Sequence, residues 1–169
     1  MIESLFLDVD FNGIIIFDYP AILSVFNGSI QQGENILSEF TSTSKGDDVL
    51  DKGICLPIMG IHDGGYLVRI FLNEEPKEQQ RQVIFSDKYF YLNVTGTLFV
   101  ADMAVFWDWE EFLGWKKADV PTGMYKVCVE GVELTNTTNE VVYAYDLILA
   151  SVDKIGIRDV EPRSDSRLY

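Results

Sequence analysis

Hydrophobic side chains recur at every second position in short runs along this chain, and the runs end at glycine, asparagine or proline. A period of two is typical of a β-strand with one buried face, because successive side chains point to opposite sides of the sheet. The 3.6-residue period of an amphipathic helix is scarce. The pattern predicts strands over residues 4–10, 13–19, 53–59, 65–72, 82–94, 97–103, 123–131 and 141–151.

The succession of strands and turns indicates a predominantly all-β fold. It favours an antiparallel β-sandwich or a partly open barrel of about 8–10 strands, with at most one or two short helices. Asn12-Gly13 predicts a hairpin between the first two strands, and Thr95-Gly96 predicts a turn after residue 94. Residues 21–26 are a further apolar piece. The polar residues 27–52 either hold one short helix around 33–40 or form a long loop.

Alternation within residues 123–131 predicts which side chains of this strand face the core. Tyr125, Val127 and Val129 fall on one face, and Lys126 falls on the other. We therefore expect the first three side chains to be buried and the lysine to point outward.

The length of 169 residues corresponds to one domain. We expect a single β-sandwich domain over residues 1–157 and a loosely held tail over 158–169, where the alternation weakens. The N-terminal residues carry acids and no basic residue before Lys45, so no secretory signal is predicted and a cytoplasmic location is expected. Cys55 and Cys128 lie in apolar runs and are expected to be buried free thiols.

The charge balance restricts the partners of this chain. It has 27 acidic and 13 basic residues, a net charge of −14. A nucleic-acid binder needs a cationic surface, and an anionic membrane would repel the chain, so neither partner is expected. The expected partner is instead cationic.

The motifs of common enzymes are not found in the sequence. It has a single histidine, His62, which is expected to lie in a surface turn, and no metal-ligand spacing, phosphate-binding loop or nucleophile elbow. We therefore expect a protein that is not an enzyme, with no cofactor and no bound metal.

Residues 99–115 contain all three tryptophans and four acids, with no basic residue. In a strand, Trp107 and Trp109 would share one face and Asp108 would take the other. One interpretation is that the tryptophans close an end of the core with the acids outward. The other is a contact surface of aromatic anchors rimmed by carboxylates, suited to a cationic partner. The candidate partner-binding residues are Trp107, Asp108, Trp109, Glu110, Glu111 and Trp115.

A turn of the form Pro121-x-Gly123-x-Tyr125 leads into an alternating strand, after the strand pair VIFSDKYFYLNV and TLFVADM. This order resembles the bacterial competence-type nuclease inhibitors and related immunity-like β-sandwich proteins, over residues 82–131. The resemblance implies a small acidic protein that binds and silences a basic nuclease or toxin. It assigns no functional residue.

The leading hypothesis is a non-catalytic acidic binding protein of the inhibitor or immunity type, with a basic nuclease or toxin as partner. The sequence makes no prediction of the oligomeric state. The alternative is a carbohydrate- or small-ligand-binding β-sandwich, which could be a hydrolase that uses two of the carboxylates of Asp102, Asp108, Glu110 and Glu111. A structural module without a dedicated ligand is the third reading. A deep cleft lined by tryptophan and two carboxylates would favour the alternative, and a flat or convex acidic face with exposed aromatic residues would favour the leading hypothesis.

Overall fold

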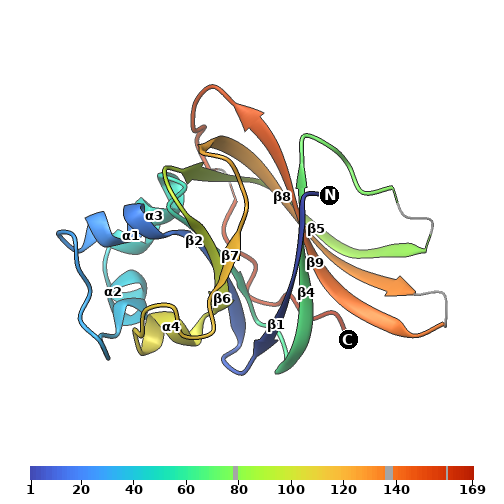
Figure 1. Ribbon diagram of the computed structural model, residues 1–169, viewed down its shortest axis with the longest axis horizontal. Helices are drawn as coiled ribbons and strands as arrows, with labels where there is room; N and C mark the ends of the chain where they lie inside the picture. Colours follow the sequence, from blue (N-terminus) through green and yellow to red (C-terminus); the bar gives the residue numbers. More distant parts are fainter. Residues whose placement is uncertain (78–79, 136–138, 159) are drawn as a thin grey trace.

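The computed structural model describes residues 1–77, 80–135, 139–158 and 160–169, and over these ranges the chain is mostly β (Figure 1). The strands are β1 (Glu3–Val9), β2 (Gly13–Asp18), β3 (Cys55–Met59), β4 (Gly64–Leu72), β5 (Arg81–Val94), β6 (Leu98–Asp102), β7 (Lys116–Ala118), β8 (Gly123–Thr135) and β9 (Val141–Val152). The helices are α1 (Tyr19–Val25), α2 (Ile36–Ser42), α3 (Lys45–Asp51) and α4 (Ala104–Trp107). The predominantly β prediction is confirmed, but the limit of two helices is wrong.

The strands form two sheets. One has five strands in the order β1-β4-β9-β8-β5, and the other has four in the order β3-β2-β6-β7. Neighbouring strands are antiparallel except for β4 and β9, which pair in parallel, so the sheets are mostly but not wholly antiparallel. A tight turn forces antiparallel pairing, whereas strands distant in sequence, as β4 and β9 are, can also align in parallel.

Apolar side chains from both sheets meet in one core. The five-stranded sheet contributes Tyr66, Val68 and Leu147, and the four-stranded sheet contributes Ile16 and Leu56. The expected face of β8 is confirmed, because the side chains of Tyr125, Val127 and Val129 are buried in this core. Lys126, between them, is only partly buried.

The hairpin predicted at Asn12-Gly13 is wrong, although both of its strands are present. β1 pairs with β4 and β2 pairs with β3 and β6, so the chain crosses from one sheet to the other at this turn. The reason is burial. All six residues of β2 are buried, whereas β1 is half exposed. A strand that is apolar on both faces needs cover on both, which a position inside the four-stranded sheet provides.

The cover on the outer face of the four-stranded sheet comes from the helices (Figure 1). Ile22 of α1, Ile36 of α2 and Val49 of α3 form a second core with Ile15 and Phe17 of β2. The apolar piece at 21–26 thus lies largely in a helix, and the stretch 27–52 holds two helices rather than one. Asp18 caps α1 by accepting a hydrogen bond from the Ala21 N–H at 2.9 Å, a common start for a helix with proline in its first turn.

Two of the described residues in the C-terminal segment 158–169, which was expected to be a loosely held tail, are buried in the body. Ser166 and Leu168 are buried, and Leu168 joins the core between the sheets. The hydroxyl of Tyr145 donates to the Ser166 carbonyl at 2.8 Å, and the Ser166 N–H donates to the Gly60 carbonyl at 3.1 Å. The segment carries no regular secondary structure in its described residues, yet hydrogen bonds and an apolar contact hold it.

Candidate functional site

The Trp-rich segment becomes a surface loop after α4. We call residues 107–113 the acidic-aromatic loop. Trp107 is 55% exposed, Phe112 55% and Leu113 62%, and the three carboxylates between Trp107 and Phe112 are exposed as well. The loop itself has no basic residue, although two lysines follow it in β7. Large apolar side chains are thus held in water beside negative charges.

Two of the three tryptophans are buried beneath this loop. Trp109 is 1% exposed and Trp115 is 8% exposed. Trp107 and Trp109 do not share a face as expected, because they lie at a helix end and in a loop instead of in a strand. Trp109 and Trp115 are therefore core residues, out of direct reach of a partner at the surface.

The buried tryptophans give the loop a firm base. Their rings meet edge to face with centroids 5.0 Å apart, and Trp115 also packs edge to face on Phe17. The Trp109 N–H donates to the Glu34 carbonyl at 3.1 Å, and the Gly33 N–H donates to the Trp109 carbonyl at 2.8 Å. Ring packing and backbone hydrogen bonds thus fix the middle of the loop.

Phe112 adopts a backbone conformation that is rare for its residue type. Its φ is +65°, in the left-handed region that bulky residues avoid. Strain of this kind persists only where the surrounding structure enforces it, and it is frequent at binding sites.

The neighbouring Glu111 accepts a hydrogen bond from the Tyr19 hydroxyl at 2.8 Å. Partial burial and this carboxylate together raise the pKa of Tyr19 to about 12.

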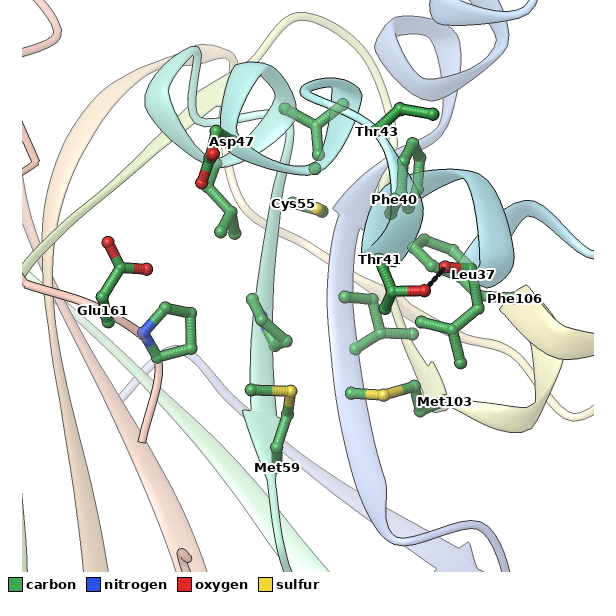
Figure 2. Close-up of a pocket in the computed structure, with 16 residues that line it drawn as sticks. Leu37, Phe40, Thr41, Thr43, Asp47, Cys55, Met59, Met103, Phe106 and Glu161 are labelled. Atoms are coloured by element: carbon green, nitrogen blue, oxygen red, sulfur yellow. Dashed lines mark hydrogen bonds between the residues drawn. The ribbon is translucent and has the colours of Figure 1, made fainter. Parts of the chain in front are cut away.

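A pocket of about 360 Å³ lies near the loop, between helices α2 and α3 and the outer face of the four-stranded sheet (Figure 2). Its walls are apolar, and its rim is polar where the chain meets solvent. The wall includes Phe40, Cys55, Met59, Met103 and Phe106, and the rim includes Thr41, Thr43, Asp47 and Glu161. The next residue after Phe106 is Trp107, so α4 contributes to both features.

The thiol of Cys55 in this pocket is not an activated nucleophile. Burial raises its pKa to about 12, so the thiol stays protonated at neutral pH. Cys128 is also a free thiol, but it is half-buried rather than buried as expected. Burial raises the pKa of this second thiol too.

One rim of the pocket is organised by Arg158, whose side chain is largely buried. Its guanidinium binds Asp51 through Nε at 3.0 Å, Glu161 through Nη1 at 2.9 Å and Asp47 through Nη2 at 3.4 Å. Three carboxylates therefore share one cation, and this rim keeps a net negative charge.

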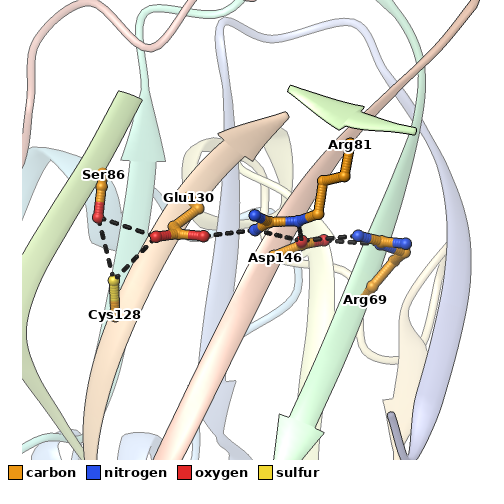
Figure 3. Close-up of polar contacts among 6 residues, drawn as sticks. All are labelled: Arg69, Arg81, Ser86, Cys128, Glu130 and Asp146. Carbon is orange, nitrogen blue, oxygen red and sulfur yellow. Dashed lines mark hydrogen bonds and ion pairs between the residues drawn. The ribbon is translucent and has the colours of Figure 1, made fainter. Parts of the chain in front are cut away.

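A buried ionic network lies on the five-stranded sheet, on the face opposite the core between the sheets (Figure 3). Asp146, which is fully buried, receives Nε and Nη2 of Arg69 at 2.6 and 2.7 Å and Nε of Arg81 at 2.9 Å. Arg81 also pairs with Glu130, which accepts a hydrogen bond from Ser86 at 3.1 Å. Both carboxylates are engaged by arginines, so the network ties β4, β5, β8 and β9 together.

His62 is an exposed residue whose ring stacks on Tyr169, with centroids 5.3 Å apart. Across the described ranges, no group of three or more histidine, cysteine, aspartate or glutamate side chains is arranged to hold a metal ion. Among those same residues, no helix has the length and apolar character needed to cross a membrane.

The six candidate partner-binding residues predicted from the sequence thus fall into an exposed group and a buried group. Trp107, Asp108, Glu110 and Glu111 are exposed together on one loop, while Trp109 and Trp115 support it from below. The exposure of Phe112 and Leu113 was missed, although the Gly114 that follows them signalled a turn. The pocket was missed as well, because its walls come from separate segments with no shared motif.

Comparison with known proteins gives no relative from which a role could be transferred. No family model, no curated protein and no solved structure matches this chain. Any role for the acidic-aromatic loop or the pocket has to be argued from the residues themselves.

Proposed function

We propose that this protein is a non-catalytic acidic binding protein of the inhibitor or immunity type, and that its acidic-aromatic loop contacts a basic nuclease or toxin. The observation that supports this most directly is the exposure of Trp107, Phe112 and Leu113 beside Asp108, Glu110 and Glu111. Aromatic anchors surrounded by polar groups are the usual energetic centre of a protein interface.

The base of the loop supports the same role. An anchor contributes most when it is already held in its bound position, because little side-chain and loop freedom is then lost on binding. Trp109 and Trp115 supply this rigidity through ring packing, and the Glu34 carbonyl supplies it through a hydrogen bond.

The net charge of −14 on this chain favours a partner with a net positive charge. A negative surface attracts a basic protein over a distance and repels acidic ones, so charge favours both rapid encounter and selectivity. The resemblance of residues 82–131 to nuclease inhibitors implies the same class of partner. Within this proposal the scaffold is a mostly antiparallel β-sandwich with the two sheets as its layers, and the loop packs on the outer face of the four-stranded sheet.

The alternative function, binding of a small ligand, is favoured by one observation, the apolar pocket of about 360 Å³. Its carbohydrate form has less support, because Trp109 and Trp115 are buried and Trp107 alone of the three tryptophans is exposed for a sugar to stack on. The two functions do not exclude each other, because the pocket and the acidic-aromatic loop are formed by different residues. The pocket is lined by Met103 and Phe106, whereas the loop begins at Trp107.

The test is a binding measurement with purified basic nucleases and toxins, first those encoded beside the gene. Trp107→Ala should weaken binding by roughly 2 kcal/mol or more, chiefly through faster dissociation, with no loss of melting temperature. The matched control is Phe6→Ala, because Phe6 is 56% exposed but lies on β1 of the other sheet. It should leave binding unchanged.

Two results would contradict the proposal. One is equal binding by the Trp107→Ala variant and the parent protein to a confirmed partner. The other is the absence of binding to every basic nuclease and toxin in the panel. Trp109→Ala serves as a further comparison. It removes a core side chain, so it should cost about 3–5 kcal/mol of stability whether or not a partner exists.

A further inference from the structure

We infer that the pocket beneath α2 and α3 binds a small cationic amphiphile, with the apolar part of the ligand in the pocket and its ammonium group at the rim formed by Asp47 and Glu161. This site is separate from the acidic-aromatic loop. The inference therefore does not depend on the proposed nuclease or toxin partner.

The size of the pocket limits its occupant to a small molecule. Sites for small ligands usually have volumes of roughly 300–1,000 Å³, and 360 Å³ lies at the lower end of that range. A single alkyl chain or one or two rings would fill such a space, whereas a helix or strand of another protein would not enter it.

The walls indicate that the buried part of the ligand is apolar. Phe106, Cys55 and Met103 are buried, and Phe40 and Met59 are half-buried at the opening. The two methionines add adaptable, polarizable surface, which suits a ligand with a flexible chain. Transfer of an alkyl chain from water to these walls provides the favourable free energy of binding.

The rim indicates the charge of the polar end. Figure 2 shows Asp47 of α3 and Glu161 of the C-terminal segment on the same side of the pocket. Both pair with Arg158, which also pairs with Asp51, so three carboxylates face one guanidinium. No lysine, arginine or histidine lies among the described residues that line the pocket. An ammonium group would relieve this excess of negative charge, whereas the carboxylate of a fatty acid would add to it.

The experiment is calorimetric titration of the full chain at pH 7 with decylamine, 1-decanol and decanoate, each below its aggregation concentration. The three probes share an alkyl chain and differ in the charge of the head group. Decylamine should bind with a stoichiometry of one, 1-decanol should bind more weakly, and decanoate should bind most weakly.

Variants locate the site and the contribution of the charge. Asp47→Asn and Glu161→Gln should each weaken decylamine binding by about two- to fivefold, the range of an exposed ion pair, and should leave 1-decanol binding unchanged. Asp51→Asn is the matched control, because Asp51 pairs with Arg158 but does not line the pocket. It should have a smaller effect than either rim variant.

Met59→Trp should fill the pocket and abolish binding of all the probes. Should this variant fail to fold, Thr41→Trp on the exposed rim gives the same test. The inference is overturned if decylamine does not bind, if decanoate binds as tightly as decylamine, or if the folded blocking variant binds decylamine as the parent does.

Discussion

The buried carboxylate of Asp18 accepts two hydrogen bonds from Thr95, one from the backbone N–H at 2.7 Å and one from the hydroxyl at 2.8 Å. The same carboxylate accepts the N–H groups of Gly96 at 3.0 Å and Ala21 at 2.9 Å. One side chain therefore joins the end of β2, the first turn of α1 and the turn between β5 and β6.

Replacement of this carboxylate should destabilise the protein strongly. Asp18→Ala leaves three backbone N–H groups without their acceptor, and we expect a loss of about 3 kcal/mol or more in the free energy of unfolding, measured with urea. Asn35→Ala is the comparison, because Asn35 caps α2 through a single hydrogen bond to the Ser38 N–H. Its loss should be about 1 kcal/mol. Equal losses for the two variants would show that the links to Thr95 and Gly96 add nothing.

The ionic network on the five-stranded sheet should be sensitive to the loss of one partner. Arg69→Met leaves the fully buried Asp146 with Arg81 as its remaining arginine in the network, and we expect a cost of about 3–5 kcal/mol. Arg163→Met removes a bidentate salt bridge with Asp87 at the surface, and the loss in the free energy of unfolding should be about 1 kcal/mol or less. Chemical denaturation of both variants gives the comparison. A small loss for Arg69→Met would mean that water replaces the arginine at Asp146.

Alkaline conditions should weaken the fold through Cys55. Its pKa is raised by burial from 9.0 to about 12, so the folded state retains a proton that the unfolded chain releases. The resulting stability is fully present below pH 9 and is lost as the pH rises through about 12. The free energy of unfolding should therefore fall over this interval.

Cys55→Ala isolates this contribution from that of the buried tyrosines. The variant should lose less stability between pH 9 and pH 12 than the parent does, even if it is less stable at pH 7. Unfolding curves at several pH values measure the two slopes. Identical slopes would indicate that the Cys55 thiol ionises in the folded protein as readily as in the unfolded chain.

Binding of a basic partner should depend on salt mainly through the association rate. Glu110→Gln should slow association and flatten its salt dependence, with little change in the dissociation rate, because exposed rim charges act chiefly on encounter. Asp63→Asn is the charge-matched control. Asp63 lies near the C-terminal Tyr169, in the turn before β4 and outside the acidic-aromatic loop. Rapid-mixing kinetics at several ionic strengths separate the two rates, and equal effects of the two variants would point to net charge alone.

Local pattern was enough to find the buried face of β8 and the strands other than the short β7, which it missed. The hairpin between β8 and β9 could also be expected, since two alternating runs flank a short polar segment, although its residues 136–138 lie outside the described ranges. Asn12-Gly13 does form a turn, as its residue types predict, and Asn12 has a φ of +47°. A turn says that the chain reverses, but not which strand becomes its neighbour.

The functional features were harder to predict for a physical reason. Asp18 could be identified as a cap from the proline two residues later, but its bond to Thr95 spans 77 residues and leaves no local trace. The separation of Trp107 from Trp109 depended on the end of a four-residue helix. Alternation describes strands, and it carries no information about a loop or about a pocket built from distant segments.

The transfer of the chain between sheets has a consequence for how fast the native state is reached. β1 and β2, β3 and β4, and β5 and β6 are successive in sequence, yet each pair is divided between the two sheets. Most pairings must therefore wait for distant segments to meet, which places the chain among slow folders with times of roughly milliseconds to seconds. The β8–β9 hairpin is the natural starting point, because its long ladder closes over a short connection. Until β2 is enclosed, its run of isoleucines stays exposed, and chaperone dependence during synthesis would follow from that delay.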